Sequence, residues 1–191
     1  MRVTGGTLGG RKILAPKTGT RPALDRVREA VFSALATCTV DVRVVDLFAG
    51  SGAYGIEAWS RGAASVCWVE QDGTAISVLR KNVKTLGIDK NKNAQVVRAD
   101  VWKWLAQTRS MEVDLVFADP PYQRREEEGQ AERLMQVMVE YRLLREGGLL
   151  VYEQGKREPV IVPEGWVLLR DRTYARTRSL IYRKEDGAGR S

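Results

Sequence analysis

The chain has 191 residues, enough for one domain with its own core; it has no membrane-spanning apolar run and no secretory signal, so we expect a cytoplasmic protein. Its 31 Lys and Arg residues outnumber 24 Asp and Glu residues, and the net charge of +7 favours a polyanionic partner. Histidine is absent, which excludes Ser-His-Asp and Cys-His nucleophilic sites and histidine-ligated metals. We therefore expect no metal site, and a chemistry based on carboxylates, backbone groups and a cofactor.

The N-terminal segment carries many basic side chains. The stretches RVTGG and RKILAP are expected to pair as a short hairpin around the glycines. A helix is expected just after Pro22, with Arg26, Arg28 and Glu29 on the face opposite its apolar residues. We interpret residues 1–36 as a nucleic-acid-binding extension, 37–185 as the catalytic domain and 186–191 as a tail. The candidate nucleic-acid contacts are Arg2, Arg11, Lys12, Lys17, Arg21 and Arg26.

From about residue 42 onward, strand and helix patterns alternate. The predicted strands lie at residues 42–48, 65–70, 94–100, 113–119, 147–154, 167–174 and 177–184. The last two are adjacent and are expected to form an antiparallel pair. The alternation predicts an α/β fold: a Rossmann-like, doubly wound, mostly parallel seven-stranded sheet with helices on both faces and a terminal antiparallel strand. The last two strands also hold a second basic cluster, Arg170, Arg172, Arg176, Arg178 and Arg183.

Carboxylates stand near the ends of the first four strands, where ligands bind in such sheets: Asp46, Glu70, Asp100 and Asp119. After the first strand, residues 50–55 fit the pattern G-x-G-x-x-G, which lets a backbone approach a ligand closely and opens a helix tightly. Glu70 follows about twenty residues later, where a carboxylate can accept the ribose hydroxyls of a nucleoside cofactor. This combination fits NAD as well as S-adenosylmethionine.

The fourth strand ends in Asp119-Pro120-Pro121-Tyr122, which resembles the (Asp/Asn/Ser)-Pro-Pro-(Tyr/Phe) motif of methyltransferases that act on exocyclic amines or amides. An arylamine nitrogen is a poor nucleophile because its lone pair is delocalised into the ring. A carboxylate and a backbone carbonyl that accept its two N–H bonds would align the lone pair with a sulfonium methyl group. Two prolines stiffen the loop, and Tyr122 offers a flat face for a flipped-out base.

The motifs GGTLGGRKILAP, TRPALDRVREAVFSAL, VDLFAGSGAYGIEAWSRGA, VEQD and FADPPY occur in the order typical of the RsmD-type family, which methylates N2 of a guanine in 16S ribosomal RNA. The resemblance runs from Met1 to about Glu153. It implies S-adenosylmethionine as the cofactor, and ribosomal RNA, within the small subunit or its assembly intermediate, as the partner of a monomer. Tyr54 departs from the pattern, because an aliphatic residue is expected there.

The resemblance also implies roles for individual residues. The methionine part of the cofactor would be surrounded by Asp46, Ala49, Gly50 and Gly52. Glu70 would hold its ribose, and Asp100 and Val101 would face its adenine. The implied cofactor-binding residues are Asp46, Phe48, Ala49, Gly50, Ser51, Gly52, Glu70, Gln71, Asp100, Val101 and Asp119. The implied catalytic residues are Asp119, Pro120, Pro121 and Tyr122.

Four other functions remain open from the sequence. A DNA adenine-N6 methyltransferase shares the motifs, although the chain has no room for a separate target-recognition domain. A protein-glutamine methyltransferase typically carries Asn before the two prolines. A non-catalytic RNA-binding assembly protein would not need the intact motifs, and a dehydrogenase would have no use for Asp-Pro-Pro-Tyr.

Overall fold

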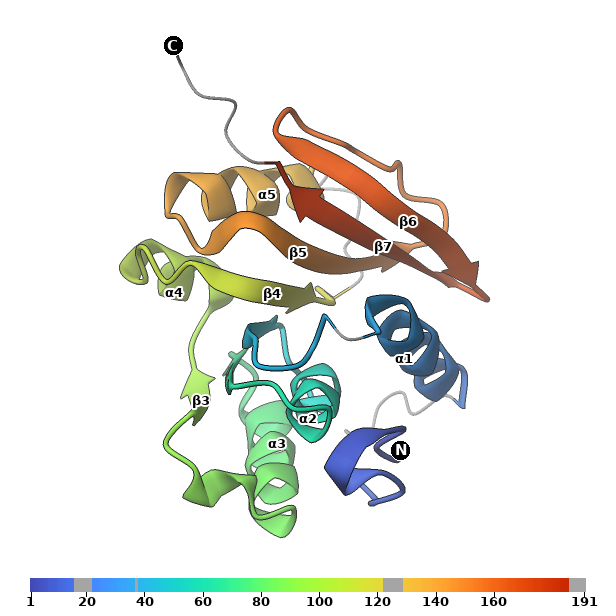
Figure 1. Cartoon of the computed structure of the whole chain (residues 1–191), viewed down its shortest axis with the longest axis vertical. Helices are drawn as coiled ribbons and strands as arrows, with labels where there is room; N and C mark the ends of the chain where they lie inside the picture. The colour runs from blue at the N-terminus through green and yellow to red at the C-terminus, as the bar shows by residue number, and fades with distance from the viewer. Residues whose placement is uncertain (16–21, 37, 122–128, 186–191) are drawn as a thin grey trace.

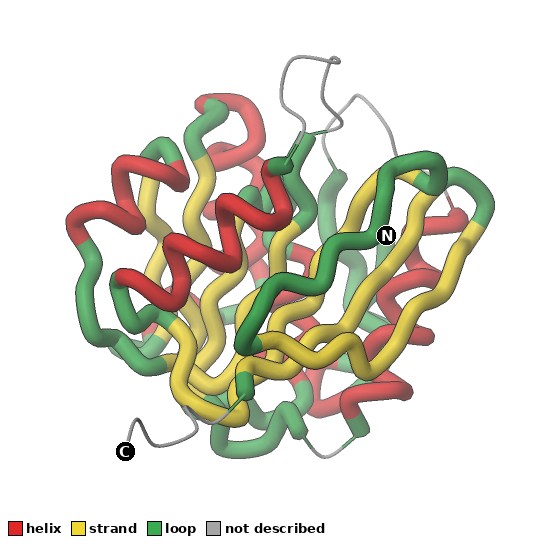
Figure 2. The backbone as a smooth tube through the Cα atoms, turned by 90° about the horizontal axis from the view of Figure 1, so that it is seen from above, coloured by secondary structure: helices red, strands yellow, loops and turns green. Residues whose placement is uncertain are grey.

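The computed structural model describes residues 1–15, 22–36, 38–121 and 129–185. A single twisted sheet of seven strands has helices on both sides (Figures 1 and 2). The strands are β1 (Arg43–Leu47), β2 (Ser65–Glu70), β3 (Ala94–Arg98), β4 (Val113–Ala118), β5 (Leu144–Gly155), β6 (Trp166–Tyr174) and β7 (Thr177–Lys184). The predicted α/β class and the seven strands are confirmed.

The strand order is β3-β2-β1-β4-β5-β7-β6. β7 pairs antiparallel with both β5 and β6, whereas the pairings among β1 to β5 are parallel. The order reverses between β1 and β4, since β2 and β3 lie on one side of β1 and the later strands lie on the other. Ligands of doubly wound sheets bind at the carboxyl ends of the strands next to such a switch point.

Alternate residues of the central strands point to opposite faces, and each face has its own core. On the first face, α1 (Pro22–Leu35), α2 (Ala53–Ser60) and α3 (Gly73–Thr85) pack against strand residues such as Val44, Trp68 and Phe117. On the second face, α4 (Val101–Gln107) and α5 (Gln130–Glu140) pack against Val45 and Val116 among others. Two short 3-10 helices, η1 (Gly6–Leu8) and η2 (Ile88–Lys90), complete the elements of the described residues.

The predicted hairpin forms at the N-terminus. Arg2 and Lys12 form an antiparallel bridge, and the Val3 N–H donates to the Arg11 carbonyl at 3.0 Å. Val3 and Ile13 are buried in the core of the first face. The residues of the predicted extension therefore share a hydrophobic core with the sheet, while their separate function stays a prediction.

The prediction that Arg28 lies on the solvent face of its helix is wrong. Arg28 is 2% exposed, because it follows the core residue Val27 directly and precedes the core residue Val31 by about one helical turn. A buried guanidinium requires a counter-charge, and the carboxylate of Glu57 on α2 supplies it. Among the described helices, none is long and apolar enough to cross a membrane.

Candidate active site

The carboxyl ends of β1, β2 and β4 lie side by side. In the sheet register Leu47 of β1 is paired with Ala118 of β4 and with Val69 of β2. The loop that follows β1 therefore starts between Asp119 and Glu70, which each come next on their strands. Its backbone is fastened to β2, since the Ala49 N–H donates to the Val69 carbonyl at 3.1 Å. The sheet thus gathers at one edge the motifs that stand far apart in the sequence.

The three glycines of the loop, Gly50, Gly52 and Gly55, differ in what surrounds them. A Cβ on Gly52 would lie 2.2 Å from the Leu79 side chain, and one on Gly55 would lie 2.2 Å from the indole nitrogen of Trp68. These two glycines let α2 pack tightly against the sheet. Gly50 has a φ of +55°, and a Cβ there would meet no atom nearer than 4.0 Å. The loop is thus open at Gly50, where a ligand can approach the backbone.

Glu70 holds the loop in place. Its Oε2 accepts from the Gly50 N–H at 2.8 Å and its Oε1 accepts from the Asp72 N–H at 2.8 Å. Each carboxylate oxygen has further lone pairs, so the side chain can still accept hydroxyl groups. Asp46 lies beneath the loop, where its Oδ2 accepts from the Gly55 N–H at 2.9 Å. Burial raises the pKa of Asp46 well above its usual range, although the Gly55 bond opposes the shift.

The residues predicted to face an adenine lie at the start of α4. Asp100 caps this helix by accepting from the Lys103 N–H at 2.9 Å, and Val101 is buried in the core of the second face. The ring of Phe48 meets the ring of Trp102 edge to face at 6.5 Å. Gln71, predicted to contact the cofactor, is exposed directly after β2. Their cofactor contacts remain predictions.

Asp119 is the first residue after β4. It is open to solvent, and within the described residues it takes part in no hydrogen bond. Neighbouring protein atoms nevertheless displace part of its hydration, which raises the pKa of the carboxyl above its usual range. Pro120 is buried and Pro121 is exposed, so the stiff turn leaves the Asp119 carboxylate accessible. Tyr122 lies outside the described residues.

Sequence reasoning missed a buried polar pair beneath this edge. The Tyr54 hydroxyl of α2 donates to Glu153 of β5, and the Tyr54 ring stacks on Phe117 of β4 with centroids 5.0 Å apart. Glu153 is 3% exposed. Burial raises its pKa, and so does the negative charge of Asp119, while the bond from Tyr54 and the charge of Arg28 oppose the shift. The unexpected tyrosine therefore serves as a hydrogen-bond donor to a buried carboxyl.

Glu153 has one weak sign in the sequence. It lies in the apolar run that forms β5, at the same parity as Leu149 and Val151, which face the core of the first side. A carboxylate at such a position needs a partner. The sequence does not say that the partner is Tyr54, which is 99 positions away.

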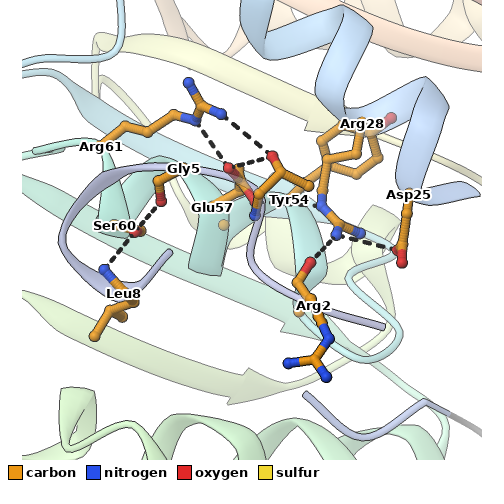
Figure 3. Close-up of polar contacts among 12 residues, drawn as sticks. Arg2, Gly5, Leu8, Asp25, Arg28, Tyr54, Glu57, Ser60 and Arg61 are labelled. Carbon is orange, nitrogen blue, oxygen red and sulfur yellow. Dashed lines mark hydrogen bonds and ion pairs between the residues drawn. The ribbon is translucent and has the colours of Figure 1, made fainter. Parts of the chain in front are cut away.

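A second carboxylate, Glu57 of α2, fastens the N-terminal hairpin to the domain (Figure 3). Glu57 accepts from the Thr4 backbone N–H at 2.8 Å and from the Thr4 hydroxyl at 2.7 Å. It also pairs with Arg61 at 2.9 Å and with Arg28 at 3.4 Å. Arg28 in turn donates to the Arg2 carbonyl at 2.5 Å. The hairpin that carries several candidate nucleic-acid contacts is therefore held by a buried network of charges.

Four of the six predicted nucleic-acid contacts lie within the described residues. Arg2, Arg11, Lys12 and Arg26 are exposed. Arg2 also donates to the Gly10 carbonyl at 2.8 Å and Arg11 to the Thr85 carbonyl at 3.2 Å. The remaining two, Lys17 and Arg21, lie outside the described residues. In the described part of the chain no three His, Cys, Asp or Glu side chains could hold a metal ion together.

Comparison with known proteins shows which family the chain belongs to. The model of the family described as "Conserved hypothetical protein 95" matches residues 1–183. The ribosomal RNA small subunit methyltransferase D of Escherichia coli K12 is 36% identical over 187 residues, which are 97% of this chain and 90% of that protein. The chain belongs to the RsmD family. The resemblance inferred from the motifs is thereby confirmed.

Two solved structures with more than 30% sequence identity share the fold. A methyltransferase structure from E. coli has a TM-score of 0.83 at 36% identity, covering 97% of this chain and 98% of that one. A methylase structure from Haemophilus influenzae has a TM-score of 0.79 at 31% identity, with the same coverage. The edge described above is thus the candidate active site of an RsmD-family chain.

Proposed function

We propose that this RsmD-family protein transfers a methyl group from S-adenosylmethionine to the exocyclic N2 of a guanine in 16S ribosomal RNA. The observation that carries the proposal is the pairing of Leu47 with Ala118 and Val69. It brings the open glycine loop between the accessible carboxylate of Asp119 and the ribose candidate Glu70.

The residues at the edge fit this cofactor. Gly50 leaves open space above the loop, and Glu70 retains lone pairs for ribose hydroxyls. Asp46 is a buried acid beside the loop, where the positively charged end of the methionine part would favour its ionised form. When bound, S-adenosylmethionine supplies an electrophilic methyl group.

The protein's own contribution to the reaction is orientation of the amine. Asp119 and the Pro120 carbonyl would each accept one N–H of the guanine N2, which aligns the nitrogen lone pair with the methyl group. Asp119 must be ionised for this role, because a protonated carboxyl offers a donor where an acceptor is required. The new N–C bond would form as the bond between the methyl group and the sulfonium sulfur breaks. One of the two amine protons would pass to the Asp119 carboxylate, so the amine would carry no lasting positive charge.

The proposal extends to the form of the substrate. The chain has a small recognition apparatus, so the shape of a preassembled small subunit or assembly intermediate would supply much of the specificity. We propose a monomer that acts in the cytoplasm, where such particles form.

The test is transfer of a labelled methyl group to small ribosomal subunits that lack the modification, followed by mass spectrometry of the nucleosides. N2-methylguanine in the 16S RNA is the expected product, and Asp119→Ala should strongly reduce it. Label in N6-methyladenine or in protein would overturn the substrate assignment and leave the cofactor assignment standing.

A further inference from the structure

A groove of about 630 Å³ begins at the starts of β4 and β5, whereas the candidate active site lies at the carboxyl ends of the parallel strands. The end of α1, together with Cys38 and Val42 before β1, forms one wall, and the starts of β4 and β5 with parts of β6 and β7 form the others. Its charged lining consists of Asp114, Arg145, Arg170, Arg172 and Arg183. Three of these arginines belong to the C-terminal basic cluster of the sequence, for which the active site has no role.

Three arginines on the last two strands share one face of the sheet. In the register Arg170 is paired with Ile181 and Arg172 with Ser179, and Arg183 follows Ile181 by two residues on β7. Ile181 packs in the core of the first face, so this row points to the same side as α1. We call Arg170, Arg172 and Arg183 the arginine stripe. Along β6, neighbouring members stand roughly 6.6 Å apart.

The arginine stripe carries unneutralised charge. No member forms an ion pair with any residue that the structure describes. Among the described residues, Asp114 is the one acid lining the groove, and it already pairs with Arg145 at 2.5 Å and with Arg43 at 3.5 Å. By contrast, Arg178 points to the opposite face, where it pairs with Asp171 at 2.5 Å. Within the cluster, Arg178 is thus neutralised by Asp171, whereas the three arginines of the stripe form no ion pair with a described residue. Arg172 does donate to the backbone carbonyl of Asp171 at 2.9 Å.

The stripe leads from the groove towards the candidate active site. Arg172 is paired with Ser179, and Ser179 is paired with Glu153, which lies beneath the catalytic edge. Two strand spacings separate Arg172 from Glu153, roughly 10 Å across the sheet. Figure 1 shows the N-terminal hairpin, α1 and the β6–β7 pair along the same side of the molecule. A polyanion bound at the catalytic edge can therefore continue over this row.

We propose that the groove and the arginine stripe form a second RNA-binding surface, which holds the phosphate backbone of the substrate away from the reacting base. This inference rests on the proposed function for the identity of the RNA. Guanidinium groups match phosphate oxygens in geometry and charge. The exposed Leu169 and the end of α1 make the lining of the groove partly apolar, and apolar side chains there could contact the sugars between the phosphates.

The experiment compares the double variant Arg170→Glu/Arg172→Glu with Lys90→Glu/Lys92→Glu. The control changes the charge by the same amount in an exposed segment next to β3, at the opposite edge of the sheet. Binding of a fluorescent 16S RNA fragment is measured by anisotropy at several salt concentrations. S-adenosylmethionine affinity is measured by calorimetry, and methyl transfer to unmodified subunits as a function of their concentration.

The stripe variant should bind RNA at least tenfold more weakly than the control variant. Its slope of log K against log salt should fall by about 0.7 to 0.9 for each phosphate that the protein no longer neutralises. Cofactor affinity and kcat should stay near the wild-type values while KM rises. Equal RNA affinity and salt slope in both variants would overturn the proposal. If Arg170→Glu/Arg172→Glu unfolds, the variant Arg170→Gln/Arg172→Gln is used instead. It changes the net charge by half as much, so a smaller loss of RNA affinity in the same direction is expected.

Two further outcomes distinguish a failure of the RNA-binding proposal from a failure of the proposed function. Normal affinity for naked RNA combined with weaker binding to assembled subunits would mean that the groove binds a ribosomal protein, and the RNA proposal would be wrong. Conversely, the stripe effect on RNA binding could be present while wild-type protein methylates no guanine of the 16S RNA. In that case the proposed function would fail and the RNA-binding surface would stand.

Discussion

Substitution of Glu57 is expected to lower the stability of the folded protein strongly. This carboxylate is fully buried, and its two oxygens accept from Thr4 and pair with Arg28 and Arg61. Glu57→Gln keeps the size of the side chain but removes its charge. Arg28, which is 2% exposed, would then be a buried cation whose one remaining ion-pair partner among the described residues is Asp25, at 3.2 Å.

The expected magnitude follows from that burial. Removing one partner of a buried ion pair typically costs about 3–5 kcal/mol, because the other charge stays desolvated. For a domain of this size each kcal/mol lowers the unfolding midpoint by about 2–4 °C, so a shift of about 6–20 °C is expected. The matched control is Glu112→Gln, which breaks an exposed ion pair with Arg142, where about 1 kcal/mol or less is expected.

The assay is thermal and urea unfolding followed by circular dichroism, with amide exchange at Thr4 as a local readout. Adding Arg28→Met to Glu57→Gln should recover part of the loss, because it removes the uncompensated charge. A loss at Glu57 no larger than at Glu112 would refute the reasoning. So would strictly additive effects of the two substitutions, since residues in one network are expected to couple.

Three other predictions concern the candidate active site. Asp119→Ala, which removes the acceptor, should lower methyl transfer about a hundredfold or more with unchanged cofactor affinity, as seen by turnover and calorimetry; near-normal turnover would remove its assigned role. Gly50→Ala should abolish thermal stabilisation by S-adenosylmethionine, whereas Gly55→Ala, which drives a Cβ into Trp68, should cost about 1–3 kcal/mol of stability without the cofactor. Glu153 has a raised pKa in the folded protein, so its contribution to stability is complete below the pKa of an unfolded glutamate and is lost as pH rises through the folded value. Glu153→Gln should therefore gain stability relative to wild type as pH rises, and a constant difference in urea midpoints from acid to alkaline pH would contradict the burial argument.

The parts of the fold that follow from local pattern could be predicted from the sequence. Apolar runs alternating with helical spacing identify strands and helices, and the right-handed rule for crossovers restricts how they connect. Asp72 caps α3 by accepting from Ala75 at 2.8 Å, and Gly87 lies beyond its end with a φ of 72°, as their residue types indicate. The strand-end position of the Asp119 motif follows from the same pattern.

Buried charges could not be predicted in the same way. Arg28 and Glu57 are 29 positions apart and Tyr54 and Glu153 are 99 apart, and each pair is stable only because packing brings its members together. Taken singly, a charged residue on a helix is normally expected to be exposed, and this expectation places Arg28 on the wrong face. Its helical position beside Val27 is the one sign of its burial in the sequence.

The buried charges also bear on how the molecule holds RNA. Counter-charges neutralise the basic residues that organise the fold, namely Arg28, Arg61 and Arg178. The arginine stripe and the exposed Arg26 are left without ion pairs to described residues, and these belong to α1 and to the sheet face that α1 shares. Charge near both ends of the chain is therefore presented on one side, with α1 between the hairpin and β6 (Figure 1). A net charge of +7 spread evenly would attract any polyanion without orienting it. Arg26 and the arginine stripe lie on the side that leads to Asp119, so their charge would orient RNA so that the target base reaches the catalytic edge.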